Sequence, residues 1–140
     1  MNTLKYYWNE KPLTTVLLAG LIFRLIAAIF SKGWGMFDDH YLVIEAAQSW
    51  VDGADYNNWL PWNQSNPQPG GHSFFYPGLH FLLFWFLQNV LGILEPQTKM
   101  YIVRFLHAFY SLLVIYLGYR ITERLSNREI AKHVGLLLAL

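Results

Sequence analysis

The sequence contains no cysteine and few charged residues. Charged side chains make up 14% of the 140 residues, against roughly 25% in ordinary soluble domains. The absence of cysteine excludes disulfides and thiolate metal sites, and it leaves the cellular compartment undecided. The formal net charge is +1, and neither a Lys/Arg-rich run nor a Gly-rich phosphate loop occurs. No electrostatic footprint therefore points to nucleic acid, and we expect no nucleic-acid partner.

Hydrophobic residues, by contrast, make up 54% of the chain and aromatic residues 18%. The apolar residues lie in long blocks, close to the roughly 17–25 residues with which a helix crosses a bilayer. This pattern predicts an all-α fold of polytopic transmembrane helices, with residues 1–140 as the N-terminal part of a multi-span transmembrane domain. The expected spans are about residues 13–30, 74–94 and 101–121, with a truncated fourth from about residue 130.

The orientation of these spans contains a conflict. Lys5 and Lys11 precede the first span and place the N-terminus in the cytoplasm, so residues 31–73 would form an extracytoplasmic loop. Strict alternation then puts the connector after the third span outside, although its basic cluster favours the cytoplasm. Either the second segment, interrupted by Pro77-Gly78, is re-entrant, or other loops outweigh this one, and the sequence leaves both open. The basic cluster comprises Arg120, Arg124, Arg128 and Lys132.

Residues 38–50 predict an amphipathic juxtamembrane helix in the extracytoplasmic loop. Polar side chains at helical spacing fall on one side and apolar side chains on the other. Such a helix would lie along the membrane surface with its apolar side down, and Gly53 would end it. The polar side comprises Asp38, Tyr41, Glu45, Gln48, Ser49 and Asp52, and the apolar side Leu42, Val43, Ala46, Ala47 and Trp50.

The acidic pair Asp38-Asp39 follows the first span directly and has two interpretations. Asp is a favoured helix N-cap, and a second carboxylate in the first turn suits the helix dipole. At a membrane surface, however, a carboxylate also accepts a proton from an attacking hydroxyl. Two adjacent carboxylates further offer hard oxygen ligands for Mg²⁺ or Mn²⁺. The residues alone leave capping and catalysis open.

Two arginines fall inside predicted spans, where a charged side chain costs a few kcal/mol and usually marks function. Arg24 lies in the first span, and Arg104 lies near the start of the third, with His107 and Ser111 following on one face. Each arginine either reaches the interface to anchor its helix or pairs with an acidic residue or an anionic headgroup. Both interpretations stay open.

The loop that follows Gly53 combines aromatic rings with amide groups. Tyr56, Trp59 and Trp62 stand among asparagines, a combination that suits a sugar ring. An aromatic belt at the lipid headgroups explains the same residues equally well. His72, just before the second predicted span, is a candidate contact for a phosphate.

Three stretches resemble the N-terminus of the GT-C glycosyltransferases, multi-span enzymes that use lipid-phosphate-linked sugars. The first is Arg24 followed by Phe37-Asp-Asp-His-Tyr41, similar to the acidic motif after the family's first span. The second, residues 71–80, looks like the start of the family's second span, with one proline where two are usual. The third runs from Arg104-Phe-Leu-His to residues 131–137 and resembles protein O-mannosyltransferases and aminoarabinose transferases.

The resemblance implies a glycosyltransferase that moves a sugar from a polyprenyl- or dolichyl-phosphate donor to a glycan, lipid or protein acceptor. The transfer would invert the anomeric carbon at the extracytoplasmic face of the membrane. By position, Asp38 would be the general base that deprotonates the acceptor, with Asp39 as its partner. The candidate substrate-binding residues are Arg24, Glu45, Trp59, His72 and Arg104.

The remaining expectations concern cofactor, location and completeness. The sequence establishes no cofactor, and Mg²⁺ or Mn²⁺ at the acidic pair stays open. A bacterial inner membrane is expected from the likeness alone. The apolar run from Val134 stops at Leu140 after about two helical turns, too short to span. We therefore expect a longer protein, of which residues 1–140 alone are inactive. The competing functions are a membrane transporter and a non-catalytic assembly subunit, in which Asp38 would only cap a helix.

Overall fold

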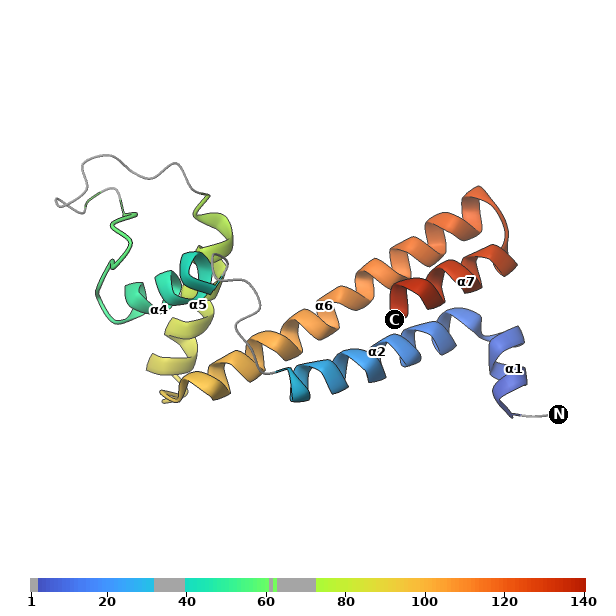
Figure 1. Cartoon of the computed structure of the whole chain (residues 1–140), viewed down its shortest axis with the longest axis horizontal. Helices are drawn as coiled ribbons and strands as arrows, with labels where there is room; N and C mark the ends of the chain where they lie inside the picture. Colours follow the sequence, from blue (N-terminus) through green and yellow to red (C-terminus); the bar gives the residue numbers. More distant parts are fainter. Residues whose placement is uncertain (1–2, 32–39, 61, 63–72) are drawn as a thin grey trace. The chain divides into compact units, whose positions relative to one another are not determined.

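The computed structural model describes residues 3–31, 40–60, 62 and 73–140 (Figure 1). Every regular element within these ranges is helical, which confirms the predicted all-α class. The contacts divide the chain into a first unit, Met1–Ser31 with Met100–Leu140, and a second unit, Lys32–Lys99. The elements are α1 (Thr3–Glu10), α2 (Pro12–Phe30), the π-helical stretch η1 (His40–Glu45), α4 (Ala46–Val51), α5 (Phe75–Asn89), α6 (Pro96–Leu125) and α7 (Arg128–Ala139).

Two helices among the described residues, α2 and α6, are long and apolar enough to cross a membrane. Helix α2 begins one residue before the first predicted span and ends with it, and α6 contains the whole third predicted span. Helix α5 has 15 residues and α7 has 12, fewer than the roughly 20 that a crossing needs. The predicted crossings at residues 74–94 and from about residue 130 therefore stay predictions.

In the first unit, α6 runs antiparallel to α2. Arg24 near the C-terminal end of α2 bonds to Ser111, and Gly20 lies against Ile115, four residues further along α6. Thr14, at the start of α2, shares a cavity with residues 119–123 of α6. The C-terminal end of α2 therefore lies beside the part of α6 that follows Met100, where the first unit resumes (Figure 1).

Helix α7 packs beside α2 through a close approach at Gly135. A Cβ atom added to Gly135 would lie 3.0 Å from Cγ1 of Val16 and 3.1 Å from Cδ2 of Tyr119. Val16 and Tyr119 are both buried, so three helices meet at this glycine. Small residues at helix interfaces are typical of membrane bundles, where close van der Waals packing holds helices together.

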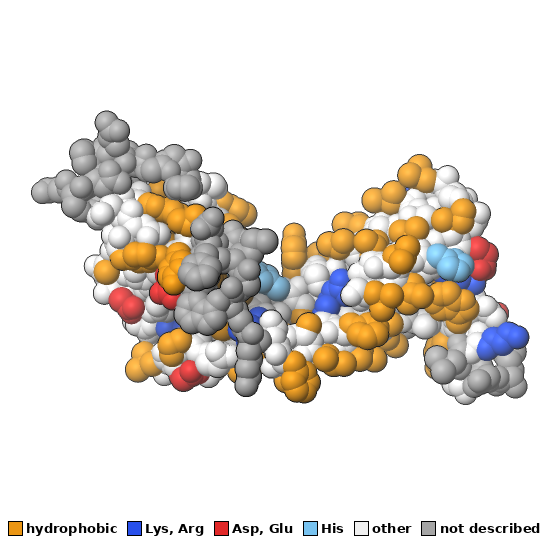
Figure 2. Space-filling view, in the orientation of Figure 1, with side chains coloured by type: hydrophobic (Ala, Val, Ile, Leu, Met, Phe, Trp, Pro, Cys, Tyr) orange, Lys and Arg blue, Asp and Glu red, His pale blue; other side chains and the backbone are white. Residues whose placement is uncertain are grey.

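The outward faces of α2 and α6 are apolar and exposed (Figure 2). An apolar surface this large on a soluble monomer would mark an interaction site. On helices of this length it suits contact with lipid chains. The exposed side chains include Ile22, Phe23, Ile26, Ile29 and Phe30 on α2, and Leu106, Phe109, Leu113, Val114 and Leu117 on α6.

In the second unit, the predicted amphipathic helix is present from residue 40 onward, as η1 followed by α4. Ala46 and Ala47 are fully buried, whereas Tyr41 and Glu45 are exposed, as the pattern predicts. The apolar side packs against α5, so another helix covers the face that was expected to rest on the membrane. Packing against a neighbouring helix removes the same apolar area from water.

Gly53 ends α4, as predicted. Its φ of 76° places it in the left-handed region, which a residue with a side chain rarely adopts. The amide of Ala54 then donates to the carbonyl oxygen of Ser49 (2.8 Å), and the amide of Gly53 donates to that of Trp50 (3.2 Å). These two bonds form a Schellman motif, which turns the chain away from the helix axis.

We predict that Gly135→Val weakens the packing of α7, because the added side chain overlaps Val16 and Tyr119. Overpacking of this kind costs about 1–3 kcal/mol, and the loss would appear as a lower thermal midpoint of the full-length protein in detergent. The control Leu137→Val places the same β-branched residue in the same helix, at a side chain that is 74% exposed. An equal loss in both variants would contradict the packing role of Gly135.

Candidate functional site

The predicted catalytic pair Asp38-Asp39 and the candidate phosphate contact His72 lie outside the described residues. Their roles stay predictions. The candidates that the structure describes are Arg24 and Arg104 in the first unit, and Glu45 and Trp59 in the second.

Arg24 uses its guanidinium to join three helices. Its Nε donates to Oγ of Ser111 on α6 (2.6 Å). Its Nη1 and Nη2 donate to the carbonyl oxygens of Ala139 and Leu138 on α7 (3.0 Å each), and Nη1 also donates to that of Gly20 (3.3 Å). A charged side chain within a span is stable only when it is partnered in this way. Among the described residues, the partners of Arg24 are thus a hydroxyl and backbone carbonyl oxygens rather than an acidic side chain, and the side chain turns inward to the neighbouring helices.

Arg104 has a donor that is not used in the part of the chain described here. Its Nη1 is buried and has no hydrogen-bond partner among these residues. The guanidinium carbon lies 5.5 Å from the ring centroid of Tyr101, within the range of a cation–π interaction. A buried donor without an acceptor costs on the order of 1–3 kcal/mol, more for a charged group. Arg104, rather than Arg24, is thus the arginine whose chemistry calls for an anionic acceptor.

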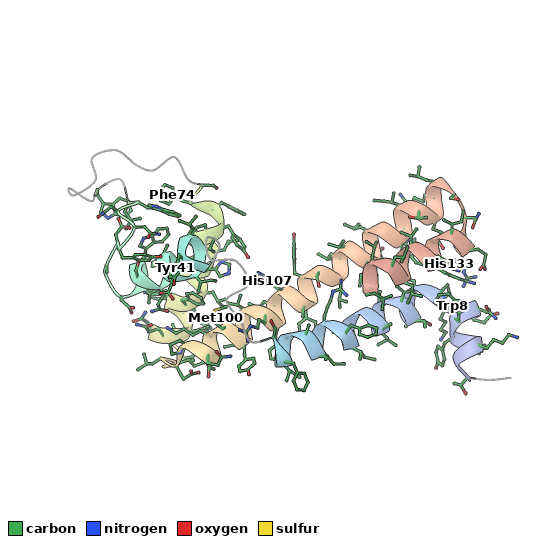
Figure 3. The ribbon with its side chains drawn as sticks, in the orientation of Figure 1. Trp8, Tyr41, Phe74, Met100, His107 and His133 are labelled. Carbon is green, nitrogen blue, oxygen red and sulfur yellow. The ribbon has the colours of Figure 1, made fainter. Side chains whose placement is uncertain are left out.

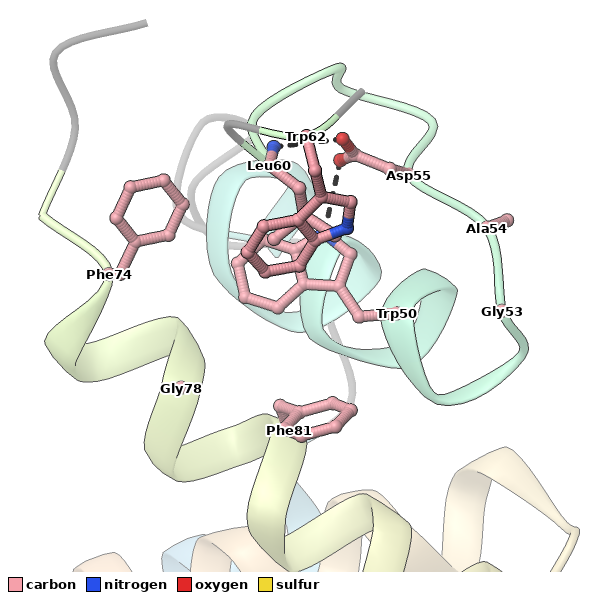
Figure 4. Close-up of a pocket in the computed structure, with 9 residues that line it drawn as sticks. All are labelled: Trp50, Gly53, Ala54, Asp55, Leu60, Trp62, Phe74, Gly78 and Phe81. Carbon is pink, nitrogen blue, oxygen red and sulfur yellow. Dashed lines mark hydrogen bonds between the residues drawn. The ribbon is translucent and has the colours of Figure 1, made fainter. Parts of the chain in front are cut away.

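A pocket of about 750 Å³ opens in the second unit, where α4, the loop after it and α5 meet (Figure 4). Aromatic rings dominate its lining. The ring centroid of Trp50 lies 6.0 Å from that of Phe74 and 6.5 Å from that of Phe81. The described lining residues are Trp50, Gly53, Ala54, Asp55, Leu60, Trp62, Phe74, Gly78 and Phe81.

Asp55 holds this loop in place. Its Oδ1 accepts from the indole Nε1 of Trp50 (3.1 Å) and from the amide of Trp59 (3.0 Å), while Oδ2 accepts from the amide of Leu60 (2.9 Å). An aspartate that binds amides a few residues further along is a common way to fix a turn. Sequence reasoning missed Asp55, although an aspartate directly before an asparagine-rich loop was the available signal.

Of the two candidate residues in the second unit, Trp59 is buried and Glu45 is exposed. Trp59 is 7% exposed and its ring centroid lies 6.4 Å from that of Trp50, so protein covers the faces that a sugar would need. Trp62 in the same loop is 75% exposed and lines the pocket. Glu45 ends η1 with its side chain exposed on the polar side of the helix, as expected.

A polar network that the sequence did not reveal ties α4 to α5 and to the first turn of α6. Nζ of Lys99 donates to Oε1 of Gln48 (2.8 Å) and of Gln88 (2.6 Å). The amide groups of both glutamines donate to Oδ1 of Asp52 (3.1 Å each). Lys99 is only 4% exposed, and a buried ammonium is stable only with such partners. The network holds the end of α4, and with it Trp50, against α5. Figure 3 labels two other side chains of this unit, Tyr41 on η1 and Phe74 directly before α5.

The described residues contain no group of three His, Asp or Glu side chains that could hold a metal ion. The predicted Mg²⁺ or Mn²⁺ ligands, Asp38 and Asp39, are not among those residues. A divalent cation at that pair stays a prediction.

Comparison with known families agrees with the helical architecture. The Alg9-like mannosyltransferase family matches residues 15–140, a range that starts within α2 and includes Asp38, the aromatic pocket and Arg104. Comparison with curated proteins and with solved structures gave no match. The predicted GT-C resemblance is confirmed. The matching family is the Alg9-like mannosyltransferases, whereas the third stretch was compared with protein O-mannosyltransferases and aminoarabinose transferases. The chain belongs to the Alg9-like mannosyltransferase family, a family of membrane glycosyltransferases with the GT-C fold.

Proposed function

We propose that this chain contributes to a mannosyltransferase that uses a polyprenyl- or dolichyl-phosphate-linked sugar at the extracytoplasmic membrane face. The observation that carries the proposal is the buried, unpartnered Nη1 of Arg104 in a chain of this family. A departing lipid phosphate supplies the anionic acceptor that such a donor requires. The acceptor molecule and the kind of membrane, expected to be a bacterial inner membrane, stay predictions.

In the proposed reaction, Asp38 accepts the proton of the acceptor hydroxyl as that oxygen attacks the anomeric carbon. The new glycosidic C–O bond forms as the C–O bond to the lipid phosphate breaks, and the carbon inverts. Negative charge develops on the phosphate, where Arg104 stabilises it. Asp39 orients Asp38, His72 contacts the phosphate, and Glu45 contacts the acceptor. Arg24 contributes indirectly, because its bonds hold α2 against α6 and α7.

The helix arrangement of the first unit supports the extracytoplasmic placement. Lys11, Arg120 and Arg128 line one polar cavity, and Nη2 of Arg128 donates to the carbonyl oxygen of Glu10 (2.8 Å). The basic N-terminus and the basic α6–α7 turn therefore share one end of the unit, which the positive-inside rule places in the cytoplasm.

Residues 32–99 leave α2 and return to α6 at the opposite end of the first unit, since these two helices are antiparallel. If α2 and α6 both cross the membrane, this segment stays on one side of it. The arrangement thus favours the re-entrant alternative for α5 over a third crossing. A re-entrant α5 would also be consistent with a cytoplasmic basic turn.

Single-cysteine variants can test this topology, because the chain has no native cysteine. Ser73→Cys and Gln97→Cys flank α5, and Arg124→Cys lies in the basic turn; all three side chains are exposed. In the full-length protein in sealed cells, we predict that a membrane-impermeant maleimide labels the first two from outside. Arg124→Cys should react only after permeabilisation. Labelling of Ser73→Cys and Gln97→Cys from opposite sides would show that α5 crosses.

For the catalytic step, we predict that Asp38→Asn lowers turnover by about 100-fold or more, the usual contribution of a general base. The measurement is sugar transfer by the full-length protein from a polyprenyl-phosphate mannose donor, normalised to folded protein. Asp39→Asn should have a smaller effect, because it acts through Asp38. Glu10→Gln, an exposed carboxylate in α1, is the matched control.

A helix-capping role would give a different result. Loss of an aspartate cap costs on the order of 1 kcal/mol of stability and leaves turnover per folded molecule intact. Unchanged turnover in both Asp38→Asn and Asp39→Asn would thus end the general-base proposal.

A further inference from the structure

We infer that the aromatic pocket of the second unit binds a neutral sugar ring of the acceptor, with Trp50 and Trp62 as its stacking surfaces (Figure 4). This inference rests on the proposed function, because it takes a glycan as the acceptor. It also replaces Trp59, which is buried, as the aromatic contact to the sugar.

The shape and chemistry of the lining suit a pyranose. A volume of about 750 Å³ lies within the ~300–1,000 Å³ of small-molecule sites. The faces of indole and phenyl rings carry partial negative charge, and the slightly positive C–H groups of a sugar ring pack well against them. Trp62 is 75% exposed, so one of these rings is open to an incoming ligand.

The charge of the lining distinguishes the acceptor from the donor. Asp55 is the single charged side chain among the described lining residues. A phosphate-linked donor would bring its negative charge towards this carboxylate, and like charges in a partly enclosed site repel. A neutral sugar avoids that repulsion, and an isoprenoid chain would bring no polar groups to the loop amides and carboxylate that border the pocket.

Hydrogen bonds position both elements that carry the tryptophans of the pocket, α4 and the loop after it. Asp55 bonds to Nε1 of Trp50 and to the backbone of Trp59 and Leu60. The Lys99 network fixes the other side of α4. A binding site whose rings are already positioned loses little conformational entropy when a ligand arrives.

Gly78 of α5 lines this pocket, and the space beside it is open. A Cβ atom added there would have no atom within 4 Å, so a larger side chain at this position would enter the open space. Because Gly is also a poor helix former, its replacement would not weaken α5. Gly78 therefore offers a way to fill the pocket without disturbing the fold.

We predict that Gly78→Leu raises the KM for a glycan acceptor at least tenfold, with the KM for the lipid-phosphate donor unchanged. Gly78→Ala should have a smaller effect in the same direction, and Trp62→Ala should also raise the acceptor KM. The assay uses the full-length protein with methyl glycosides of mannose, glucose and N-acetylglucosamine as acceptor probes. Leu82→Phe adds bulk to α5 at a side chain that is 61% exposed and outside the lining, and it should change neither KM.

An unchanged acceptor KM in Gly78→Leu, at an undiminished thermal midpoint, would overturn the inference. A rise in the donor KM instead would assign the pocket to the donor and overturn it as well. If the wild-type protein transfers no sugar, the proposed function fails, and the pocket is then tested by tryptophan fluorescence titration with the same glycosides. Saturable binding that Gly78→Leu abolishes would still support a sugar site, whereas its absence in the wild type would reject one.

Discussion

The guanidinium of Arg24 is the interaction on which the first unit depends. Helices that are apolar on their outer faces gain little from associating in lipid, because lipid chains solvate them equally well. The bond from Arg24 to Ser111 gives α2 and α6 a directional connection, and carbonyl oxygens of α7 accept from the same guanidinium in this structure. The close contact at Gly135 then makes the surrounding surfaces fit. A charged side chain that would be costly in the hydrocarbon region of a bilayer thus contributes to the specific packing of these helices.

The second unit uses the same physical principle in a more polar setting. Lys99 is buried and donates to two glutamine side chains, and both glutamines donate to Asp52. Their bonds orient α4, while Asp55 orients the loop after it. The positions of the aromatic rings in the pocket therefore depend on the hydrogen bonds of Lys99, Asp52 and Asp55. In both units a cation with several hydrogen-bond acceptors, partly buried Arg24 in the first and buried Lys99 in the second, holds the apolar groups around it in position.

The sequence predicted the features that depend on local pattern. The hydropathy of residues 13–30 predicted α2 to within one residue, and helical spacing predicted which side of η1 and α4 is buried. Hydropathy underestimated α6, because it measures the apolar thickness of a span, whereas the helix itself continues from Pro96 to Leu125.

Features that depend on tertiary contacts could not be predicted in this way. Nothing in the order of Trp59 and Trp62 shows which ring is buried, because that depends on Trp50 folding back onto the loop. Lys99 stood in what looked like a short connector, and its partners are 51 and 11 residues away. The catalytic assignment of Asp38 and Asp39 still depends on family resemblance, since the described residues do not include them.

The antiparallel pairing of α2 with α6 has an evolutionary consequence. Everything between Ser31 and Met100 joins the helix pair at one end only, so its length and composition can change without altering the register of the membrane helices. Selection can therefore change this segment while the helix pair keeps its packing, because loops tolerate change better than the elements they connect. Divergence among such enzymes should be concentrated in this insertion, and the contacts around Arg24 and Gly135 should change least.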